Sequence, residues 1–496
     1  MPIPADLFLS PDLSEADARA YLDSLGFRDA AAVDESLQAM AADPSLREAF
    51  GRIAGDLLPS LCESPDPDAA VDGLARYLKV RTGRVMFLEY LADDPRAMHA
   101  LTTVLGSSPF LTEILIRDPE YFHWLVPQIE RSAPDRQDLE EEVSTLLAHV
   151  HEPVEALETL KRWKRREILR IATRDLLRRD TVPSTTAQLS DLAAVIINRV
   201  LELVAPQVTE SAGHDSLPGE FAVIAMGKLG GAELNYSSDV DLLYVYTADP
   251  EERARARGVF QQLARDLTVA LTDHTPEGYF YRVDLRLRPA GPKAPIVASL
   301  EECAEHYQTR GETYERFAMV KARPIAGSPA LGREFMACVQ PFVYRRPEPA
   351  VRTQLPPRAA HLESAGREPV SNVKTGPGGI RELELFTQMF QLTNGAAQPS
   401  LQNSNTLAAL EALAGAGLIA EPLRRELAHA YEFLRAVEHR LQLVHDAAVH
   451  TLPESLAELR FTARRLGLAS AEELQKQLDA YRARIHEIYQ GLYENR

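Results

Sequence analysis

The chain has 496 residues, a formal net charge of -18 at pH 7 and only three cysteines. A chain of this length exceeds what one hydrophobic core organises, so three or four domains of about 150 residues each are expected. The acidic balance excludes a sequence-independent hold on DNA or RNA, which needs a basic surface, and leaves proteins and small charged ligands as partners. Cys62, Cys303 and Cys338 are odd in number and widely spaced, which argues against a disulfide framework or a zinc cluster and favours a reducing cytoplasm.

The sequence also predicts neither a membrane segment nor an export signal. No apolar run approaches the roughly 20 residues needed to cross a bilayer. The amino terminus, MPIPADLFLSPD, lacks a basic region followed by an apolar stretch.

Most of the chain before the central segment is predicted to be helical. Short apolar-periodic stretches over residues 1–130 predict an N-terminal helical domain, and residues 131–212 should form long helices leading into the next domain, over about 153–179 and 187–205. The first of these helices has a basic face that fits a solvated or internally paired surface, or a docking surface for phosphate or an acidic partner. That face consists of Lys161, Arg162, Lys164, Arg165, Arg166, Arg170 and Arg174.

The central segment, residues 213–335, carries the chemistry. Residues 221–226 form a continuous apolar run, as expected of a strand buried on both faces. The following GKLGG, residues 227–231, is either a plain turn or a loop whose glycines let backbone N–H groups approach phosphate oxygens. Asp239 and Asp241 then lie one residue apart at the start of a second apolar strand, so their carboxylates share one face.

A third strand is predicted over residues 281–289, where strict alternation places Asp284 on one face among Arg282, Arg286 and Arg288. By itself this pattern equally fits a cross-strand ladder of ion pairs. Beside the Asp-x-Asp pair, however, three carboxylates within about 4 Å would repel by roughly 4 kcal/mol per pair at an effective dielectric of 20. Two ions of magnesium or manganese would relieve that repulsion and would stabilise the entering and leaving oxygens of an in-line displacement at phosphorus.

The remainder of the chain is predicted to return to helix. Residues 336–372 are proline-rich and polar and should form a mobile linker, and residues 373–496 should form a C-terminal helical bundle. Glu382 and Glu384, near the start of its first helix, fit either ordinary partners of the helix dipole or groups facing the cleft. Glu438, His439 and Arg440 are expected to serve core packing or ion pairing.

Five motifs carry a resemblance to a known family: GKLGG, SSDVDLL, YRVDLRLRP, GETYERFAMVKARPIAG and GPGGIRELEL. They resemble the nucleotidyltransferase domain of glutamine-synthetase adenylyltransferase/adenylyl-removing enzymes, a branch of the DNA polymerase β-like superfamily. The resemblance implies a mostly helical α+β fold, in which a mixed sheet with helices is flanked by an N-terminal helical domain and a C-terminal helical bundle.

The resemblance also implies roles for individual residues. Asp239, Asp241 and Asp284 would be the catalytic, metal-binding acids. Glu382 and Glu384 are weaker candidates. The nucleotide or phosphate would be bound by Gly227, Lys228, Gly230, Gly231, Ser237, Ser238, Arg286 and Arg288.

The family enzyme has two such domains, an amino-terminal one that removes AMP from a glutamine-synthetase tyrosine by phosphorolysis and a carboxy-terminal one that attaches it from ATP. The run Gly378-Gly379-Ile380-Arg381-Glu382 resembles the removing half, as does Glu-Leu-Asn-Tyr before the serines. The ending at residues 489–496, within or just after a helix, favours an amino-terminal fragment over a naturally single-domain relative. Prolines at 347, 349, 356 and 357 depart from the regular helix that the family has there.

Three functions are therefore in play: phosphorolytic removal of AMP from glutamine synthetase, ATP-dependent adenylylation by the same site, and a catalytically silent regulatory module. The retained acids weigh against the third. The implied partners are glutamine synthetase, phosphate, ADP, ATP and, for control, glutamine and a PII-type signalling protein, with neither nucleic acid nor a membrane.

Overall fold

The computed structural model describes residues 4–10, 12–345 and 371–494. The chain divides into two compact units, each assembled from segments that are distant in the sequence. The first unit comprises residues 1–132, 166–181 and 437–477, and the second comprises residues 133–165, 182–436 and 478–496. Three long helices, α11 (Pro153–Leu176), α22 (Glu421–His445) and α24 (Ala471–Glu494), each contribute to both units.

The first unit is built from helices whose starts are written locally in the sequence. Four of them begin with proline directly after Asp43, Asp66, Asp94 or Ser108, and each of these side chains accepts a backbone N–H of the first turn. The complete helices of this unit are α1 (Asp6–Leu9), α2 (Glu15–Leu25), α3 (Ala30–Met40), α4 (Pro44–Glu63), α5 (Pro67–Val80), α6 (Arg84–Asp93), α7 (Pro95–Ser107), α8 (Pro109–Arg117), α9 (Tyr121–Ile129) and α23 (Leu456–Arg465).

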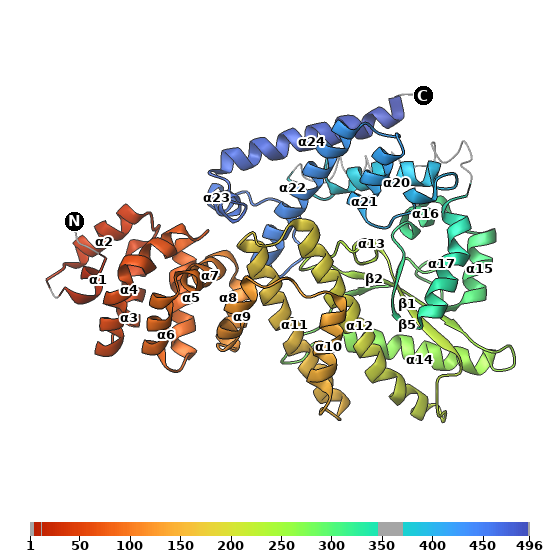
Figure 1. Ribbon diagram of the computed structural model, residues 1–496, viewed down its shortest axis with the longest axis horizontal. Helices are drawn as coiled ribbons and strands as arrows, with labels where there is room; N and C mark the ends of the chain where they lie inside the picture. The colour runs from red at the N-terminus through yellow and green to blue at the C-terminus, as the bar shows by residue number, and fades with distance from the viewer. Residues whose placement is uncertain (1–3, 11, 346–370, 495–496) are drawn as a thin grey trace. The chain divides into compact units, whose positions relative to one another are not determined.

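The second unit contains a mixed five-stranded sheet (Figure 1). Its order is β3-β2-β1-β5, and β4 also pairs with β2. The central strand β1 runs antiparallel to β2 and β5, whereas β2 runs parallel to β3 and β4. The strands are β1 (Glu220–Ala225), β2 (Val240–Thr247), β3 (Val283–Asp284), β4 (Val297–Ser299) and β5 (Arg323–Gly327).

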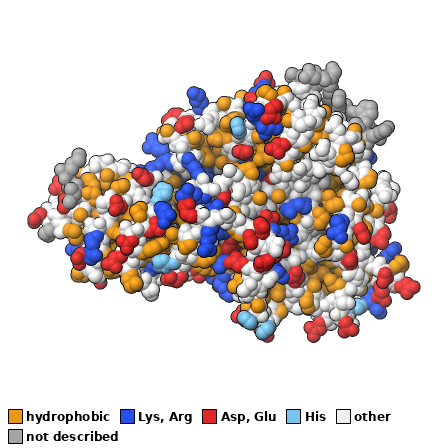
Figure 2. All heavy atoms as spheres, in the orientation of Figure 1, with side chains coloured by type: hydrophobic (Ala, Val, Ile, Leu, Met, Phe, Trp, Pro, Cys, Tyr) orange, Lys and Arg blue, Asp and Glu red, His pale blue; other side chains and the backbone are white. Residues whose placement is uncertain are grey.

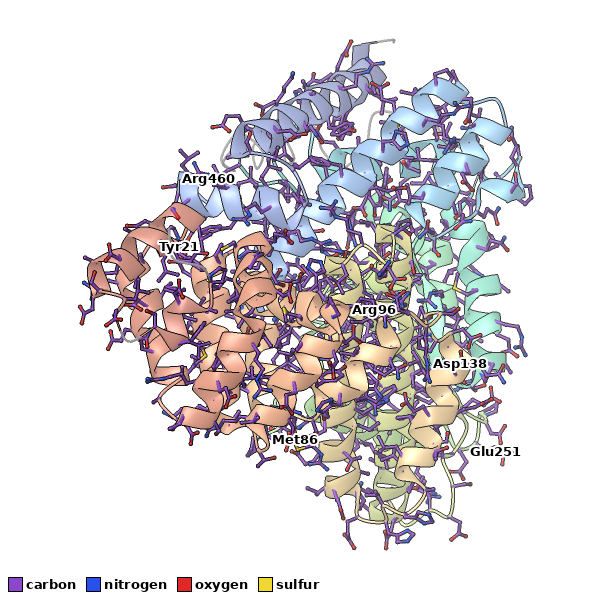
Figure 3. All side chains as sticks on the ribbon, turned by 60° about the vertical axis from the view of Figure 1, so that its left-hand side comes forward. Tyr21, Met86, Arg96, Asp138, Glu251 and Arg460 are labelled. Carbon is purple, nitrogen blue, oxygen red and sulfur yellow. The ribbon has the colours of Figure 1, made fainter. Side chains whose placement is uncertain are left out.

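Helices pack around this sheet. Phe260 of α14 stacks on Tyr246 of β2 and Phe221 of β1, with ring centroids 4.8 and 5.9 Å away. Asp138, labelled in Figure 3, completes a capping box with Asp135 at the start of α10. The complete helices of the second unit are α10 (Arg136–Leu147), α12 (Val182–Ser211), α13 (Gly227–Gly230), α14 (Arg253–Thr272), α15 (Leu300–Thr309), α16 (Thr313–Met319), α17 (Pro329–Val343), α20 (Ile380–Asn394), the 3-10 turn η1 (Pro399–Leu401) and α21 (Thr406–Gly415).

This architecture confirms the expected mostly helical α+β fold with a mixed sheet in its middle. Helix α11 matches the helix expected over residues 153–179, and β1 matches the apolar run at 221–226. Helix α12 is longer at both ends than the helix expected over 187–205. In the C-terminal part, α20, α21, α22, α23 and α24 are all helical, as expected.

The third predicted strand is wrong over most of its length, because β3 covers only residues 283–284. Asp284 ends the strand itself: its Oδ1 accepts the backbone N–H of Arg286 at 2.8 Å, which is the Asx-turn geometry that competes with strand pairing. The chain then turns through Ala290 and Gly291, both at positive φ. The alternating apolar and charged residues therefore form an arginine-rich turn and not an extended strand.

The expectation that no segment could cross a membrane also needs correction. Helix α12 is long and apolar enough by length and composition. Most of its apolar window is buried inside the protein, which is the usual property of a core helix.

The basic face of α11 is paired internally, so the docking alternative is not supported. In the second unit, Lys161 donates to Thr275 Oγ1 at 3.0 Å and Arg165 to Glu277 Oε2 at 2.7 Å. In the first unit, Arg170 pairs with Glu167 and Arg174 with Asp180. Figure 2 shows acidic and basic side chains interspersed on the face in view.

Two predictions concern the region after residue 335. The first residues of the expected linker, up to Val343, belong to α17, while residues 346–370, with the four prolines at 347, 349, 356 and 357, lie outside the described residues.

The ion-pairing role expected of Glu438, His439 and Arg440 is confirmed in the first unit. His450 pairs with Glu438 at 2.9 Å, and Asp175 accepts two bonds from Arg440 at 2.6 and 2.7 Å.

Asp175 generates a prediction for stability. Burial raises the pKa of its carboxyl, but the Arg440 guanidinium outweighs this and holds the pKa well below its ordinary range. We expect Asp175→Asn to lower the free energy of unfolding by about 3 kcal/mol at neutral pH, because it leaves the Arg440 guanidinium buried without its counter-ion. A depressed folded-state pKa stabilises above the unfolded value of about 3.9, so the difference from wild type should shrink as the pH falls below it.

Chemical denaturation of both proteins at several pH values measures this effect. Glu130→Gln, in the half-exposed pair with Arg179, is the matched control and should cost no more than about 1 kcal/mol. Equal losses in the two variants would contradict the prediction.

Candidate active site

Two of the three predicted acids meet at the edge of the sheet. Strands β2 and β3 are parallel, and Asp241 lies directly opposite Asp284 in their register, so both side chains project from the same face. Burial raises the pKa of Asp241 to about 6, and the carboxylates of Asp284 and Asp239 add to the rise while Lys374 opposes it. Among the described residues, none donates a hydrogen bond to the Asp241 carboxylate. This carboxylate therefore sits in the field of two other acids without the partners that normally stabilise its charge.

The glycine turn lies against this carboxylate. Gly227 has a positive φ of 54°, and a Cβ built on it would lie 2.3 Å from Asp241 Oδ2. No other residue could hold the backbone this close to the acid, so the first glycine of GKLGG is required by the site. The backbone N–H of Met226 also donates to the Asp241 carbonyl at 2.8 Å, which ties the end of β1 to the start of β2.

Each of the other two acids is paired with an arginine. Arg282 Nε donates to Asp239 Oδ1 at 2.6 Å. Arg286 binds Asp284 through Nε and Nη2, and these hydrogen bonds lower the pKa of Asp284. Within the part of the chain that the structure describes, no three acids, histidines or cysteines are placed as in a formed metal centre. Asp241 and Asp284 thus lie opposite each other, and arginines pair with Asp239 and Asp284.

The predicted phosphate-binding residues divide into two groups. The hydroxyl of Ser238 has no protein partner among the described residues, and it lies beside Asp239. Ser237 accepts from Arg282 through its carbonyl, at 2.8 Å. Arg288 instead donates to the carbonyls of Leu285 and Ala294, at 2.7 and 3.0 Å, so it holds the turn after β3.

The last two glycines of the turn have a packing role. A Cβ on Gly230 would lie 1.8 Å from the carbonyl oxygen of Lys321, and one on Gly231 would lie 2.8 Å from Glu233 Oε2. Lys228 contributes a positive charge close enough to help lower the pKa of Glu384. The glycine turn is therefore packed against protein on one side and against Asp241 on the other.

A buried ion network lies behind the turn. The ammonium of Lys321, which is 6% exposed, contacts Glu233, Glu384 Oε1 at 2.8 Å and Thr406 Oγ1 at 3.2 Å. Burial lowers the pKa of Lys321, but the two carboxylates reverse this and raise it well above its ordinary value. Lys321 is thus held as a cation at neutral pH.

The two glutamates of α20 are both engaged in contacts within the protein. Glu384 is the counter-ion of Lys321. Glu382, 1% exposed, accepts the backbone N–H of Gly378 at 2.9 Å and contacts His486 Nδ1 at 3.0 Å. They make separate sets of contacts, as their spacing of two residues along the helix predicts.

Carbonyl groups of the turn are held from several elements. Arg323 of β5 donates to Leu229 and Gly230, at 2.8 and 3.1 Å. Asn405 donates to the Gly231 carbonyl at 3.1 Å, and Arg435 of α22 donates to the carbonyl of Glu233. These bonds place the turn firmly at the sheet edge, next to the acids.

Residues 98–338 match the family model described as glutamate-ammonia ligase adenylyltransferase. Residues 98–338 form a domain of that adenylyltransferase family. Residues 353–493 match the model described as GlnD PII-uridylyltransferase.

Several similar proteins are named bifunctional glutamine synthetase adenylyltransferase/adenylyl-removing enzyme. That of Streptomyces coelicolor is 36% identical over 464 residues, covering 89% of this chain and 44% of the relative. That of Burkholderia pseudomallei is 35% identical, covering 80% of this chain and 45% of the relative, and that of Streptomyces avermitilis is 34% identical, covering 94% and 46%. The chain therefore spans less than half the length of these relatives.

Sequence reasoning missed three residues beside the site of this adenylyltransferase domain. Lys374, whose charge acts on Asp241, lies just before the GPGG motif and is the only cation in the segment 371–380. Arg282 was visible only as one member of an alternating pattern. Glu233 could have been suspected as an acid in an otherwise apolar and glycine-rich turn, but its partner Lys321 lies far away in the sequence.

The raised pKa of Asp241 predicts that the domain would be more stable without this charge. Since the pKa rises from an ordinary value of about 3.9 to about 6 on folding, the carboxylate destabilises the folded state increasingly from about pH 4 to pH 6 and fully above that. In metal-free buffer, Asp241→Asn should therefore raise the free energy of unfolding by about 1–3 kcal/mol at neutral pH and by nothing near pH 4.

Urea denaturation at the two pH values measures this difference. Asp239→Asn, two residues away, is the matched control. It removes an exposed carboxylate that already has an arginine partner, and it should be neutral or slightly destabilising. A loss of stability in Asp241→Asn at neutral pH would contradict the prediction.

Proposed function

We propose that this chain removes AMP from an adenylylated tyrosine of glutamine synthetase by phosphorolysis, taking up phosphate and releasing ADP. The observation that carries the proposal is the pair Asp241 and Asp284, aligned on parallel strands beside a glycine turn. A structural domain gains nothing from a half-buried carboxylate without hydrogen-bond donors, whereas phosphoryl transfer needs clustered acids. The similarity to adenylyltransferases assigns the chemistry to a nucleotidyl group.

The acids fit divalent magnesium or manganese. Their hard carboxylate oxygens suit these ions, and the pKa of Asp241 is raised by burial first and then by the charges of Asp284 and Asp239, which a cation would offset. Asp239, Asp241 and Asp284 would hold two ions, which when bound supply electrostatic stabilisation of the entering and leaving oxygens. Asp284 can bind an ion only after the Arg286 guanidinium has moved away from the Asp284 carboxylate.

Three side chains are placed to bind phosphate oxygens. Lys374 brings a positive charge to Asp241. Ser238 has a hydroxyl without a protein partner among the described residues. Arg286 has an exposed guanidinium whose hydrogen bonds all go to Asp284, so its release would supply a fork suited to phosphate.

The proposed reaction forms one bond to phosphorus and breaks another. An oxygen of hydrogen phosphate forms a bond to the phosphorus of the adenylyl group, the bond from phosphorus to the tyrosyl oxygen breaks, and the products are ADP and the unmodified tyrosine side chain of the synthetase. The proton that hydrogen phosphate loses balances the one that the tyrosyl oxygen gains. Phosphate is already a competent nucleophile and needs no strong base. The tyrosyl oxygen, whose phenol has a free pKa of about 10, must gain a proton as it leaves.

The direction rests on the resemblance of the run Gly378-Gly379-Ile380-Arg381-Glu382 to the removing half. The relatives' names cover both activities, and the same acids would serve ATP-dependent adenylylation. We therefore keep adenylylation as the second candidate. The proposal places the reaction in the cytoplasm, with glutamine synthetase as protein substrate and a PII-type signalling protein as a further partner.

The direction can be tested with the purified chain, magnesium, phosphate and adenylylated glutamine synthetase. We expect ADP to appear and to depend on phosphate, with loss of AMP from the synthetase measured by mass spectrometry. Consumption of ATP with unmodified synthetase, and no ADP in the first reaction, would instead establish adenylylation. Inactivity in both reactions would point to a regulatory module.

The assignment of the acids makes a second prediction. Asp239→Ala and Asp241→Ala should each lower turnover by about 10²-fold or more, the scale of losing one preorganised electrostatic contact, without unfolding the chain. Steady-state rates and circular dichroism measure both effects. Asp266→Ala, on the exposed side of α14, is the control and should leave turnover unchanged. Unchanged rates in the two site variants would contradict the assignment of Asp239 and Asp241 as catalytic acids.

A further inference from the structure

We propose that Arg282 is a positioning residue for Asp239, holding its carboxylate and the neighbouring backbone in place for a divalent cation. The inference rests on the metal-binding part of the function proposed above. It assigns a role to a residue that the motif comparison left without one.

Arg282 uses its three nitrogens to join three separate groups. Nε donates to Asp239 Oδ1 at 2.6 Å. Nη2 donates to the carbonyl of Ser237 at 2.8 Å and to its hydroxyl at 3.4 Å. Nη1 donates to the hydroxyl of Tyr279 at 3.0 Å. Among the described residues, only Oδ1 of Asp239 accepts a hydrogen bond. Oδ2 is therefore available to bind a cation.

The partner Tyr279 is itself held in place. Its ring stacks on His274, with centroids 4.4 Å apart and an interplanar angle of 25°. Its carbonyl accepts from Lys164 Nζ at 3.4 Å, and the same ammonium contacts the Phe280 carbonyl.

The rest of the segment before β3 is anchored by the same helix. Lys161 binds Thr275, and Arg165 binds Glu277 through both its carbonyl and its carboxylate, at 3.0 and 2.7 Å. The basic face of α11 therefore organises residues 273–280. Through Tyr279, this anchoring extends to the guanidinium that holds Asp239.

Arg286 provides the contrast that makes the inference testable. It too pairs with a predicted metal ligand, but its hydrogen bonds all go to Asp284 and its side chain is 78% exposed, against 39% for Arg282. Each arginine places one positive charge beside one acid. Only Arg282 also connects its acid to a fixed framework, as the supporting residues of a metal ligand do.

The experiment measures binding of manganese alone to the full chain, without nucleotide or phosphate, by the electron paramagnetic resonance signal of free Mn²⁺. Both Arg282→Gln and Arg286→Gln remove one charge beside an acid. We expect Arg282→Gln to bind Mn²⁺ at least about 10-fold more weakly than Arg286→Gln, the usual range for losing a residue that supports a metal ligand. Circular dichroism and thermal melting verify folding, and Arg255→Gln, which changes an exposed side chain of α14, should match wild type.

The variant Arg282→Lys separates position from charge. It keeps the positive charge but cannot reach Asp239, Ser237 and Tyr279 together, so its affinity should resemble that of Arg282→Gln. Wild-type affinity in Arg282→Lys, or binding by Arg282→Gln equal to or tighter than by Arg286→Gln, would overturn the inference. Failure of wild type to bind Mn²⁺ any better than Asp241→Asn would overturn the proposed metal site together with it. The direction of AMP transfer does not enter this test.

Discussion

The second unit depends on one interaction, the pairing of the buried Lys321 ammonium with two glutamates. A cation taken from water into a protein interior costs several kcal/mol unless it is paired and hydrogen-bonded. Its partners come from three places: Glu233 after the glycine turn, Glu384 on α20 and Thr406 at the start of α21. A displacement of any of these elements would leave a charge buried without its partner. The glycine turn and helices α20 and α21 are therefore held together by one electrostatic requirement.

This rigidity determines the geometry of the acids. The glycine turn cannot move away, because Arg323, Asn405 and Arg435 hold its carbonyls, and Gly227 consequently lies directly against Asp241. On the other side, Asp284 is aligned with Asp241 by the pairing of β2 with β3. The folded state thus keeps Asp241 in an environment that its charge disfavours. A local loss of folding stability is common at sites that bind a ligand of opposite charge.

Much of this site could be predicted locally. Strand β1 follows from its apolar run, whereas β2 begins at Val240, so Asp241 lies in the strand and Asp239 precedes it. The extent of the third strand could not be predicted, because Asp284 satisfies the backbone N–H of Arg286 with its own side chain. The roles of Gly230 and Gly231 were also hidden, since a glycine required for packing and one required for ligand approach look alike in a sequence. Glu382 likewise serves the Gly378 turn and His486 rather than the cleft.

By itself the sequence determined which residue types were present and which local elements they favour: a mostly helical chain, a glycine turn, and an acidic pair at the start of a strand. Only the tertiary structure decided what those residues meet. It brought Lys161 and Arg165 of α11 against residues 273–280, paired Asp239 with Arg282 and placed Lys321 between two glutamates. The physical reason is that these contacts join positions far apart in the chain. Local periodicity specifies the direction of a side chain, whereas the partner of a buried charge is specified by the packing of the whole unit.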